Sequence, residues 1–454
     1  MTTRAAPRTQ ISEPTEARRI AATFQSYRDF VDAALFDPEW GYYSTGQVRF
    51  GEGGHYDTFP IALSPMFGRM VVQYAFRVWR RAGEPRAFEV CELGAGNGQL
   101  CLDALLWLDE RARRDRAWRR FAAHARYRIV ERSPALIARQ RAQLGPLARR
   151  VTWTRADLAQ RPARGTPFAG HGVVIANEVL DCLAHHQVVR QADGSPGVVF
   201  VIPEVATDAD FDAHNVTLVP GVGGVCNAVA PADLGTVVRD ERWHDHLSFR
   251  EVTLPVQMVP ELHLFLWWHY PEFFAPRHRI KPYFACPGIE TMVVNTARLY
   301  RHPVVLWIDY GDGRDFHLTA PVSQRVFAGP PRSGASVYDA PGADDITFMV
   351  DFSVVAAAAQ RAGLRVAFYG GQGELARRSG VRFDADTEAL ILRHRMLQWL
   401  LAVVGVGPER AWRHTSLTWT KGQGRGGRLR ADVRRAIGEF TGRYGTDFRL
   451  MLLR

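Results

Sequence analysis

Lysine is almost absent from this chain of 454 residues, although the net charge is +10. Only Lys281 and Lys421 contribute to the 57 basic side chains, and all the others are arginines. Neither lysine completes a GxxxxGK[ST] motif, which excludes a phosphate-binding P-loop of that type. The densest arginine run, Glu110–Arg120, is interrupted by acids, as on a solvated helix face. We attribute the arginine bias to coding composition, and we expect no nucleic-acid partner.

Long apolar runs, cysteine pairs and a signal sequence are also missing. No window of about 18 uncharged apolar residues exists, so we expect no membrane span and no membrane partner. The five cysteines form no CxxC pair, which is typical of a reducing compartment, and we expect a cytoplasmic protein. Residues 1–23 lack an apolar signal core, and we expect a disordered leader there. His244-Asp245-His246 has no third ligand at motif spacing, so we expect no metal.

Apolar strands alternate with amphipathic helices along the chain, which predicts an α/β protein with a mostly parallel sheet. The predicted strands are Ala87–Leu93, Arg126–Glu131, Val151–Thr154, Gly172–Ala176, Val304–Ile308, Leu364–Tyr369 and Phe448–Leu453. Helices are predicted over Leu100–Arg113 and after Ser133-Pro134, a capping residue followed by proline.

More than a hundred residues separate the fourth and fifth predicted strands, too many for a plain crossover. We interpret them as an inserted, substrate-facing subdomain. The predicted organisation is a leader (1–23), a segment covering cofactor or substrate (24–86), a core (87–190), the insertion (191–300) and the rest of the core (301–454). The aromatic stretch Phe265–Phe274 could line an apolar substrate pocket; the alternative is that it forms core. On a strand, the pairs Trp267-Trp268 and Phe273-Phe274 would point opposite ways, so at most half of these rings could face a ligand.

The strongest local signal is the run Glu92-Leu93-Gly94-Ala95-Gly96-Asn97-Gly98, where a strand ends and a helix begins. Glycines allow the sharp turn and the close approach of a ligand to the backbone. The GxGxG spacing differs from the GxGxxG of dinucleotide sites. Glu92 would repel a pyrophosphate but attract the ammonium of a methionine moiety. The run therefore predicts a site for S-adenosylmethionine (SAM), with a purely structural turn as the alternative.

Acidic and amide side chains follow the next strands, and the carboxyl ends of parallel strands share one edge of the sheet. Glu131 is suited to accept hydrogen bonds from both ribose hydroxyls of an adenosyl group; a surface glutamate near a helix start is the alternative. Asp157 would contact the adenine amino group, and Asn177 with Glu178 would lie beside the methionine end. The predicted SAM-binding residues are Glu92, Gly94, Gly96, Asn97, Gly98, Glu131, Arg132, Asp157, Leu158, Asn177 and Glu178.

Motifs in nearly the whole chain resemble the MidA-like family of class I methyltransferases, which includes a mitochondrial arginine methyltransferase that assists respiratory complex I assembly. The similar segments are Phe30–Tyr43, Ser64–Gly68, Glu92–Leu100, Glu131–Pro134 with Gln140, Asn177–Asp181, Cys286-Pro287, Asp309–Gly311, Asp345–Thr347, Val350–Phe352, Gln372 and Phe448–Leu453. The resemblance implies SAM as cofactor and a Rossmann-like methyltransferase sheet of seven strands, closed by the last residues.

The chain departs from the family pattern where substrate is expected. His55 stands where the family has an acid, Ile61 where it has a glutamate, and His185-His186 follow an altered Asp-Ala-Leu-Pro run. His55 is the first candidate for a general base, and His185 or His186 is the second. A structural or surface histidine is the alternative for each. Asp57 and Asp181 would orient the base or the substrate, or cap turns.

These features predict a SAM-dependent methyltransferase that acts on a small molecule of specialised biosynthesis or on a protein arginine. The departures and the insertion favour the small molecule slightly. The alternative is a methyltransferase-fold protein that binds SAM without methylating and serves as an assembly partner or catalyses another reaction. Assembly as a homodimer or with a partner protein stays open.

Overall fold

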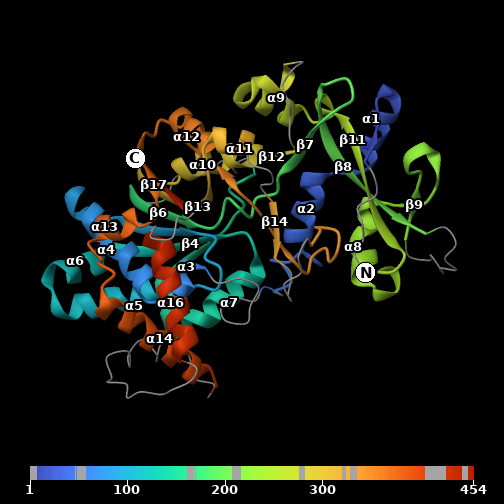
Figure 1. The fold of residues 1–454 in the computed structure, drawn as a ribbon. Helices are drawn as coiled ribbons and strands as arrows, with labels where there is room; N and C mark the ends of the chain where they lie inside the picture. Colours follow the sequence, from blue (N-terminus) through green and yellow to red (C-terminus); the bar gives the residue numbers. More distant parts are fainter. Residues whose placement is uncertain are drawn as a thin grey trace. The chain divides into compact units, whose positions relative to one another are not determined.

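The computed structural model forms two compact units, each made of three separate stretches of the chain (Figure 1). Unit 1 comprises Met1–Val48, Asp181–Glu290 and Gly313–Val354, and unit 2 comprises Arg49–Leu180, Thr291–Asp312 and Val355–Arg454. The structure describes residues 8–46, 48, 58–160, 168, 170–206, 216–275, 282–319, 324–327, 335–403, 426–441 and 448–454.

Unit 2 is built on a sheet in which seven strands follow the order β17-β18-β13-β6-β3-β4-β5. These strands are β3 (Phe88–Leu93), β4 (Ala125–Glu131), β5 (Val151–Arg155), β6 (His171–Asn177), β13 (His302–Asp312), β17 (Val366–Gly371) and β18 (Phe448–Leu453). The pairs from β13 to β5 are parallel, whereas β18 runs antiparallel to both β13 and β17. All seven predicted strands are confirmed, and the architecture is the predicted Rossmann-like α/β fold.

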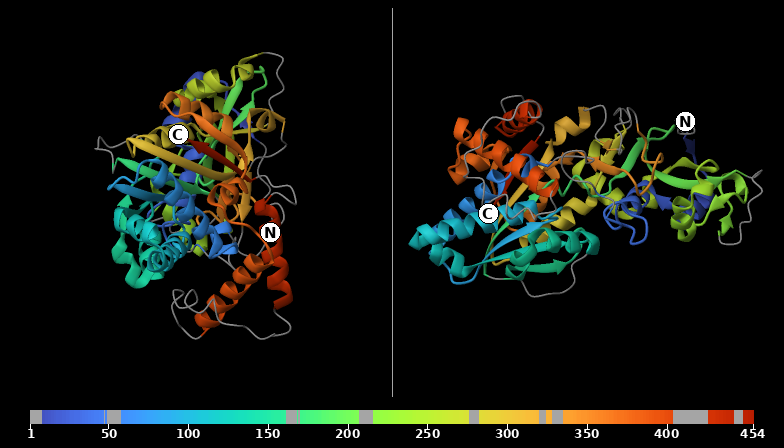
Figure 2. Two further views of the ribbon diagram at one scale, coloured as in Figure 1. Left: turned by 90° about the vertical axis from the view of Figure 1, so that its left-hand side faces the viewer. Right: turned by 90° about the horizontal axis from the view of Figure 1, so that it is seen from below.

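Helices cover the sheet of unit 2. They are α3 (Phe59–Ala62), α4 (Met66–Arg81), α5 (Gln99–Arg114), α6 (Arg116–His124), α7 (Pro134–Leu144), the 3-10 helix η1 (Gly145–Arg150), α13 (Glu374–Ser379), α14 (Ala385–Val403) and α16 (Gly426–Thr441). Figure 2 shows α14 and α16 lying side by side. The chain stretches of α10 (Pro287–Ala297) and α12 (Phe352–Arg361) include residues of both units. The predicted helices appear as α5 and α7, and the Ser133 hydroxyl caps α7 by accepting from the Leu136 backbone N–H at 3.2 Å.

Helices α4 and α5 approach each other closely at Gly68, where an added Cβ would lie 2.5 Å from the Cβ of Asp103. Asp103 is fully buried and accepts hydrogen bonds from the Ser64 hydroxyl (2.7 Å) and the Gln99 amide (3.0 Å). His394 Nε2 lies 4.0 Å from an Asp103 oxygen. Burial raises the pKa of Asp103 to about 7 and lowers the pKa of His394 to about 3. The uncharged forms of both groups are therefore favoured here.

The Asp103→Asn substitution is expected to flatten the pH dependence of stability. Because the folded-state pKa of Asp103 lies above its unfolded value, its contribution is fully present below about pH 4 and is lost as pH rises through about 7. The wild-type melting temperature should fall between pH 5 and pH 8 more than that of the variant, as measured by thermal unfolding. The Asp386→Asn variant, which changes an exposed acid on α14, should keep the wild-type profile. Identical profiles for wild type and Asp103→Asn would contradict this assignment.

Unit 1 contains a second, mostly antiparallel sheet with the central order β1-β11-β8-β10-β9, in which β7 and β2 also pair with β8, and β12 pairs with β7. Its strands are β1 (Thr9–Gln10), β2 (Gln25–Ser26), β7 (His186–Arg190), β8 (Pro196–Val205), β9 (Leu218–Val219), β10 (Ala228–Val229), β11 (Leu247–Pro255) and β12 (Tyr283–Ala285), with β14 (Gln324–Phe327), β15 (Asp345–Phe348) and β16 (Val350–Asp351) elsewhere in the unit. Its helices are α1 (Pro14–Thr23), α2 (Tyr27–Phe36), α8 (Leu234–Arg239), α9 (Pro260–His269) and α11 (Arg314–Thr319), with 3-10 turns η2 (Val222–Gly224), η3 (Pro231–Asp233), η4 (Glu241–Trp243), η5 (Val256–Met258) and η6 (Pro271–Phe274).

The prediction of a disordered leader is wrong for residues 8–23. Strand β1 pairs with β11, and helix α1 buries Ala17 and Ile20. The Glu13 carboxylate caps α1 by accepting from two backbone N–H groups, and Pro14 occupies the first turn. This local start signal is present in the sequence but was outweighed by the polar composition.

The predicted insertion (191–300) overlaps the middle stretch of unit 1, Asp181–Glu290, but unit 1 also takes in residues 1–48 and 313–354. The division between the units therefore falls inside the segment predicted to cover the cofactor or substrate (24–86). None of the described helices combines the length and apolar character that a membrane crossing requires.

The aromatic stretch forms helix α9 and the turn η6, so its interpretation as a strand is wrong. The stretch is apolar on every side, and such a run carries no period that separates a helix from a strand. Helix α9 buries Leu262, Phe265 and Leu266, while Trp267 and Trp268 are 61% and 70% exposed. Both neighbouring tryptophans are thus exposed, instead of alternating between a buried and an exposed face.

Candidate functional site

The glycine run forms a tight bend between β3 and α5 in unit 2. Gly94, Gly96 and Gly98 have φ angles of +60°, +52° and +86°, in the region that side-chain-bearing residues rarely adopt. An added Cβ at Gly94 would also lie 3.1 Å from a methyl group of Val179. Gly98 immediately precedes α5, and Asn97 accepts from the Gln99 N–H at 3.0 Å. The bend therefore presents bare backbone at the amino end of a helix, as predicted for a ligand-binding turn.

Three strand ends are adjacent at this edge of the sheet. In the register of the parallel strands, Leu93 of β3 is opposite Val130 of β4 on one side and Ala176 of β6 on the other. The residues that follow these positions are Gly94, Glu131 and Asn177. The structure thus brings the glycine bend, the predicted ribose-binding acid and the predicted methionine-side amide to one edge, which is where open α/β sheets bind ligands.

Glu131 ends β4 and is only 5% exposed. One carboxylate oxygen accepts from the Ser133 backbone N–H, and the other accepts from the Gln140 side-chain amide, both at 3.0 Å. Burial raises the pKa of Glu131. The Arg132 backbone also hydrogen-bonds to this carboxylate, and because a carboxylate has about four acceptor positions, it keeps capacity for a further donor.

Gln140 on α7 is a positioning residue that the sequence analysis matched to the family but gave no role. Its amide N–H₂ donates to Glu131 and to the Gly96 carbonyl (3.1 Å), and its carbonyl accepts from the Trp153 indole (3.0 Å). One buried side chain thereby ties the glycine bend, the acid of β4 and strand β5 together.

Glu92 lies one residue before the end of β3, is 4% exposed and accepts a hydrogen bond from the Tyr127 hydroxyl at 2.7 Å. Burial, with the nearby negative charge of Glu131, raises the pKa of Glu92 to about 8. The carboxyl group is therefore largely protonated at neutral pH unless a cation lies near it. Its contact with the ammonium of a methionine moiety stays a prediction.

Asn177 ends β6, and Glu178 follows it. Glu178 has a positive φ of +53°, which is rare for a residue with a side chain and is held here by a hydrogen bond from its N–H to the Ile308 carbonyl (2.8 Å). Asn177 donates to the Glu178 carboxylate at 2.8 Å. The Asn177 carbonyl oxygen Oδ1 is buried and has no hydrogen-bond partner in the described part of the chain. A buried acceptor of this kind is suited to a donor on a ligand.

Asp309 on β13 fixes the turn after β6. One of its oxygens accepts from the backbone N–H groups of Val179 (3.1 Å) and Leu180 (3.0 Å), and the side chain is 1% exposed. Asp309 lies in the family-like motif Asp309–Gly311, but its role could not be predicted from the sequence. An acid directly after an apolar strand was the signal that pointed to it.

Arg132 and Asp157 form an ion pair with a 3.3 Å contact between β4 and the turn after β5. Asp157 also accepts from the Ala159 N–H at 2.9 Å, and the Leu158 carbonyl accepts from the Asn295 amide at 2.8 Å. The turn at Asp157 and Leu158 is therefore held in place from two sides. The predicted contact with adenine is not tested by this geometry and stays a prediction.

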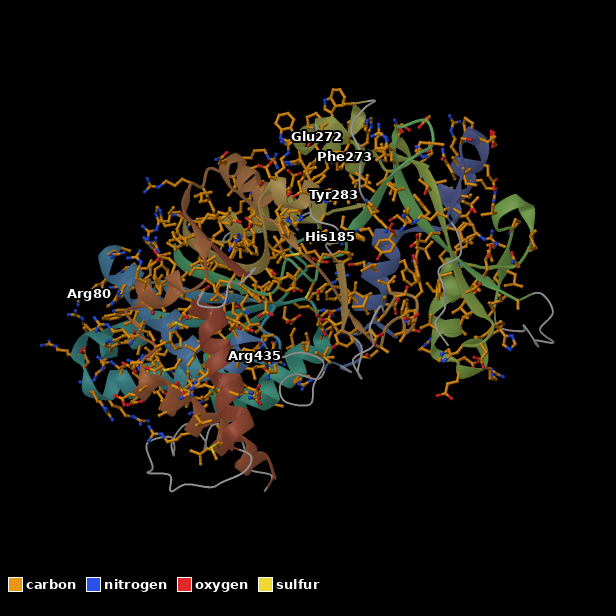
Figure 3. All side chains as sticks on the ribbon, in the orientation of Figure 1. Arg80, His185, Glu272, Phe273, Tyr283 and Arg435 are labelled. Atoms are coloured by element: carbon orange, nitrogen blue, oxygen red, sulfur yellow. The ribbon has the colours of Figure 1, made fainter. Side chains whose placement is uncertain are left out.

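Two of the four predicted catalytic residues lie in a part of the chain that the structure does not describe, and the other two lie in unit 1. His55 and Asp57 lie outside the described residues, while His185 and His186 belong to unit 1. His185 is labelled in Figure 3. His185 Nδ1 lies 2.6 Å from the Leu183 carbonyl, so it carries the proton and donates it, and the ring stacks on Phe348. Burial lowers the pKa of His185 to about 3. These contacts favour the structural alternative for His185.

His186 is also buried, with Nε2 3.6 Å from the Glu261 carboxylate.

The Asp181 backbone carbonyl accepts a hydrogen bond from the Phe348 N–H at 2.9 Å. Nearby in unit 1, the Tyr43 hydroxyl donates to the buried Asp345 carboxylate at 2.8 Å and lies 3.1 Å from Cys182 Sγ. Three of the family-like segments, far apart in sequence, therefore meet at a buried polar cluster in unit 1.

Residues 70–370 match the family model described as "Putative S-adenosyl-L-methionine-dependent methyltransferase". The chain belongs to this family of SAM-dependent methyltransferases, whose cofactor is SAM. The predicted membership of the MidA-like family, the predicted class of enzyme and the predicted cofactor are thereby confirmed.

The particular relatives are arginine methyltransferases of mitochondria. The protein arginine methyltransferase NDUFAF7 homolog of Drosophila melanogaster is 36% identical over 77 residues, which cover 17% of each chain. Protein arginine methyltransferase NDUFAF7 of Danio rerio is 34% identical over 90 residues, 20% of this chain and 21% of that protein. The Xenopus tropicalis protein is 26% identical over 234 residues, 48% of this chain and 50% of that protein. The alignments thus span half or less of the length of these relatives.

Two crystal structures of proteins from Burkholderia thailandensis share the fold. One, bound to S-adenosyl-homocysteine, has a TM-score of 0.58 and 20% identity, covering 98% of this chain and 95% of that chain. The other has a TM-score of 0.57 and 19% identity, covering 98% and 94%. They confirm the predicted Rossmann-like methyltransferase fold.

Proposed function

We propose that this chain transfers the methyl group of SAM to an arginine side chain of a protein. The observation that carries the proposal is the adjacency, at one edge of the unit 2 sheet, of the glycine bend, the Glu131 carboxylate and the Asn177 oxygen. The residues present fit the cofactor. Glu131 retains acceptor capacity for a ribose hydroxyl, and the unpartnered Asn177 Oδ1 matches an ammonium donor.

When bound, SAM supplies an electrophilic methyl group on a sulfonium. The chain's own contribution is to hold the acceptor in line and without competing water. An arginine acceptor presents a planar guanidinium, whose natural partner is a carboxylate. Glu178, beside Asn177 at the predicted methionine end, is our candidate for this orienting role. Its strained backbone is maintained by surrounding hydrogen bonds, as is common for residues at functional sites.

The choice of substrate rests on the relatives. The departures at His55 and Ile61 favour a small molecule in the sequence, but His55 lies outside the described residues and Ile61 lies in the short helix α3. The relatives named above are arginine methyltransferases. We therefore give protein arginine precedence, which makes the implied partner a protein. A cytoplasmic location is part of this proposal, supported by the five free cysteines, although those relatives are mitochondrial.

The test is methyl transfer from radiolabelled SAM in a cell extract. We expect label in protein bands and methylarginine after acid hydrolysis, with much less label when Glu131→Gln replaces the wild type at the same, subsaturating SAM concentration. Label confined to small solutes would contradict the arginine substrate and support the small-molecule alternative. SAM binding without transfer to any fraction would contradict the transferase assignment itself and favour a repurposed methyltransferase fold.

A further inference from the structure

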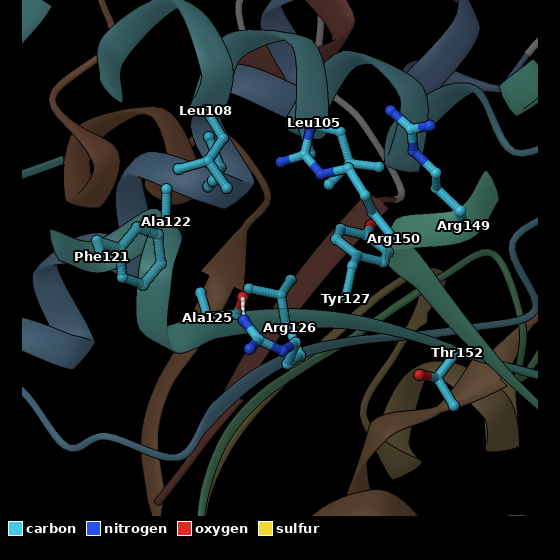
Figure 4. Close-up of a pocket in the computed structure, with 13 residues that line it drawn as sticks. Leu105, Leu108, Phe121, Ala122, Ala125, Arg126, Tyr127, Arg149, Arg150 and Thr152 are labelled. Atoms are coloured by element: carbon cyan, nitrogen blue, oxygen red, sulfur yellow. Dashed lines mark hydrogen bonds between the residues drawn. The ribbon is translucent and has the colours of Figure 1, made fainter. Parts of the chain in front are cut away.

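Unit 2 contains a cavity away from the strand ends that carry the cofactor-binding residues (Figure 4). It lies among α5, α6, β4 and η1, near the amino-terminal part of β4, and has a volume of about 360 Å³. This volume falls within the range of small-molecule sites, which is roughly 300–1,000 Å³. At roughly 30 Å³ per non-hydrogen atom, the share of one water in the liquid, it accommodates about twelve such atoms.

The lining of this α5–α6 cavity is in part apolar and in part polar. Leu105 of α5 and Phe121 of α6 are buried side chains that face it, together with the ring of Tyr127 from β4. The Tyr127 hydroxyl is occupied by its hydrogen bond to Glu92. These side chains are suited to contact the apolar body of a ligand, while the polar part of the lining is suited to a polar head group.

The rim of the cavity is positively charged. Arg126, Arg149 and Arg150 line it, and no acidic side chain does. Arg150 is paired with Asp109 at 2.7 Å, and Arg126 donates only to neutral backbone carbonyls. Arg149 is exposed and makes no hydrogen bond or ion pair within the described part of the chain. Two of the three guanidinium groups therefore have no carboxylate partner there.

We propose that the α5–α6 cavity binds an amphipathic organic anion, with a short apolar chain between Leu105, Phe121 and Tyr127 and a carboxylate or phosphate head at Arg149 and Arg126. Guanidinium groups bind both heads through charge-assisted hydrogen bonds. The site is separate from the predicted SAM site. Strand β4 contributes its first residues, Ala125–Tyr127, to the cavity, whereas Glu131 is at the other end of this strand. The proposal therefore does not depend on methyl transfer.

Decanoate, with twelve non-hydrogen atoms, is a probe of matching size. We expect saturable binding by calorimetry, with a dissociation constant on the order of 10–100 µM. Decyl phosphate should bind as well, whereas decanol, which lacks the charge, should bind about tenfold more weakly. Equal affinity for decanol and decanoate, or no saturable binding of decanoate, would overturn the proposal.

Variants test the two halves of the site. Arg149→Glu should weaken decanoate binding about tenfold or more and leave decanol unaffected, and Ala122→Phe should fill the cavity and abolish binding of both. Arg116→Glu, the same charge change at an exposed position of α6 outside the cavity, is the matched control. SAM affinity is measured for every variant, so that loss of folding is recognised. Wild-type decanoate affinity in Arg149→Glu or in Ala122→Phe would contradict the assignment.

Discussion

The Glu131→Gln variant is expected to bind SAM about 10- to 100-fold more weakly than the wild type. Hydrogen bonds to a charged group contribute roughly 1.5–3 kcal/mol each, and the substitution removes the charge while keeping the shape. The Gln140 amide donates to one oxygen of the Glu131 carboxylate. A glutamine at position 131 would place its own N–H₂, which is a donor, either against the Gln140 donor or toward the ligand, and in both cases an acceptor is lost. Isothermal calorimetry with SAM and its demethylated product measures the effect.

The control for this prediction is Glu110→Gln, which makes the same change in a glutamate of α5 that pairs with Arg114 at 3.3 Å on the surface. Its SAM affinity should equal that of the wild type, because exposed ion pairs contribute little. The melting temperature of Glu131→Gln shows whether the variant is folded. Unchanged SAM affinity in a folded Glu131→Gln variant would remove the assignment of the ribose-binding acid.

The Leu452→Ala variant should lose about 2–5 kcal/mol of stability. Leu452 is fully buried in β18, which is hydrogen-bonded to β13 on one side and to β17 on the other. Truncating a buried leucine removes apolar contact and leaves a cavity that its neighbours fill only partly. Urea unfolding followed by tryptophan fluorescence should show a lower midpoint at an unchanged slope.

The same substitution at Leu264 is the matched control, since that side chain is 68% exposed on α9. Its effect should stay within about 0.5 kcal/mol, as for other surface changes. A Leu452→Ala midpoint equal to that of Leu264→Ala would mean that β18 contributes little to the stability of the sheet.

Most of the unit 2 sheet could be predicted because its strands are short apolar runs that end at glycines or acids. Strand β6 (His171–Asn177) is apolar almost throughout, as expected for a strand covered on both faces. Helix α9 could not be predicted in the same way, because its apolar residues surround the whole helix and leave no period. Helix α1 was missed although Glu13-Pro14 is a start signal, since the surrounding composition is polar.

The candidate site was predictable to the extent that its residues follow strand ends. Glu131 and Asn177 were found by that rule, and Asp309 satisfies it too. Gln140 does not, because its contacts with Glu131, Gly96 and Trp153 depend on how α7 packs over the sheet. The sequence also could not show that the Asn177 oxygen has no hydrogen-bond partner in the described part of the chain, because this depends on the folded surroundings and not on the residue type.

The position of β18 between β13 and β17 also determines when the protein can complete its fold during synthesis. The ribosome delivers β3, β4 and β6 early, but the strand that joins β17 to the rest of the sheet comes from residues 448–453. Until those residues leave the exit tunnel, β13 and β17 each keep an edge of unpaired backbone groups. Such open edges are prone to associate with other strands, so nascent chains of this protein should depend on chaperones until residues 448–453 have left the exit tunnel.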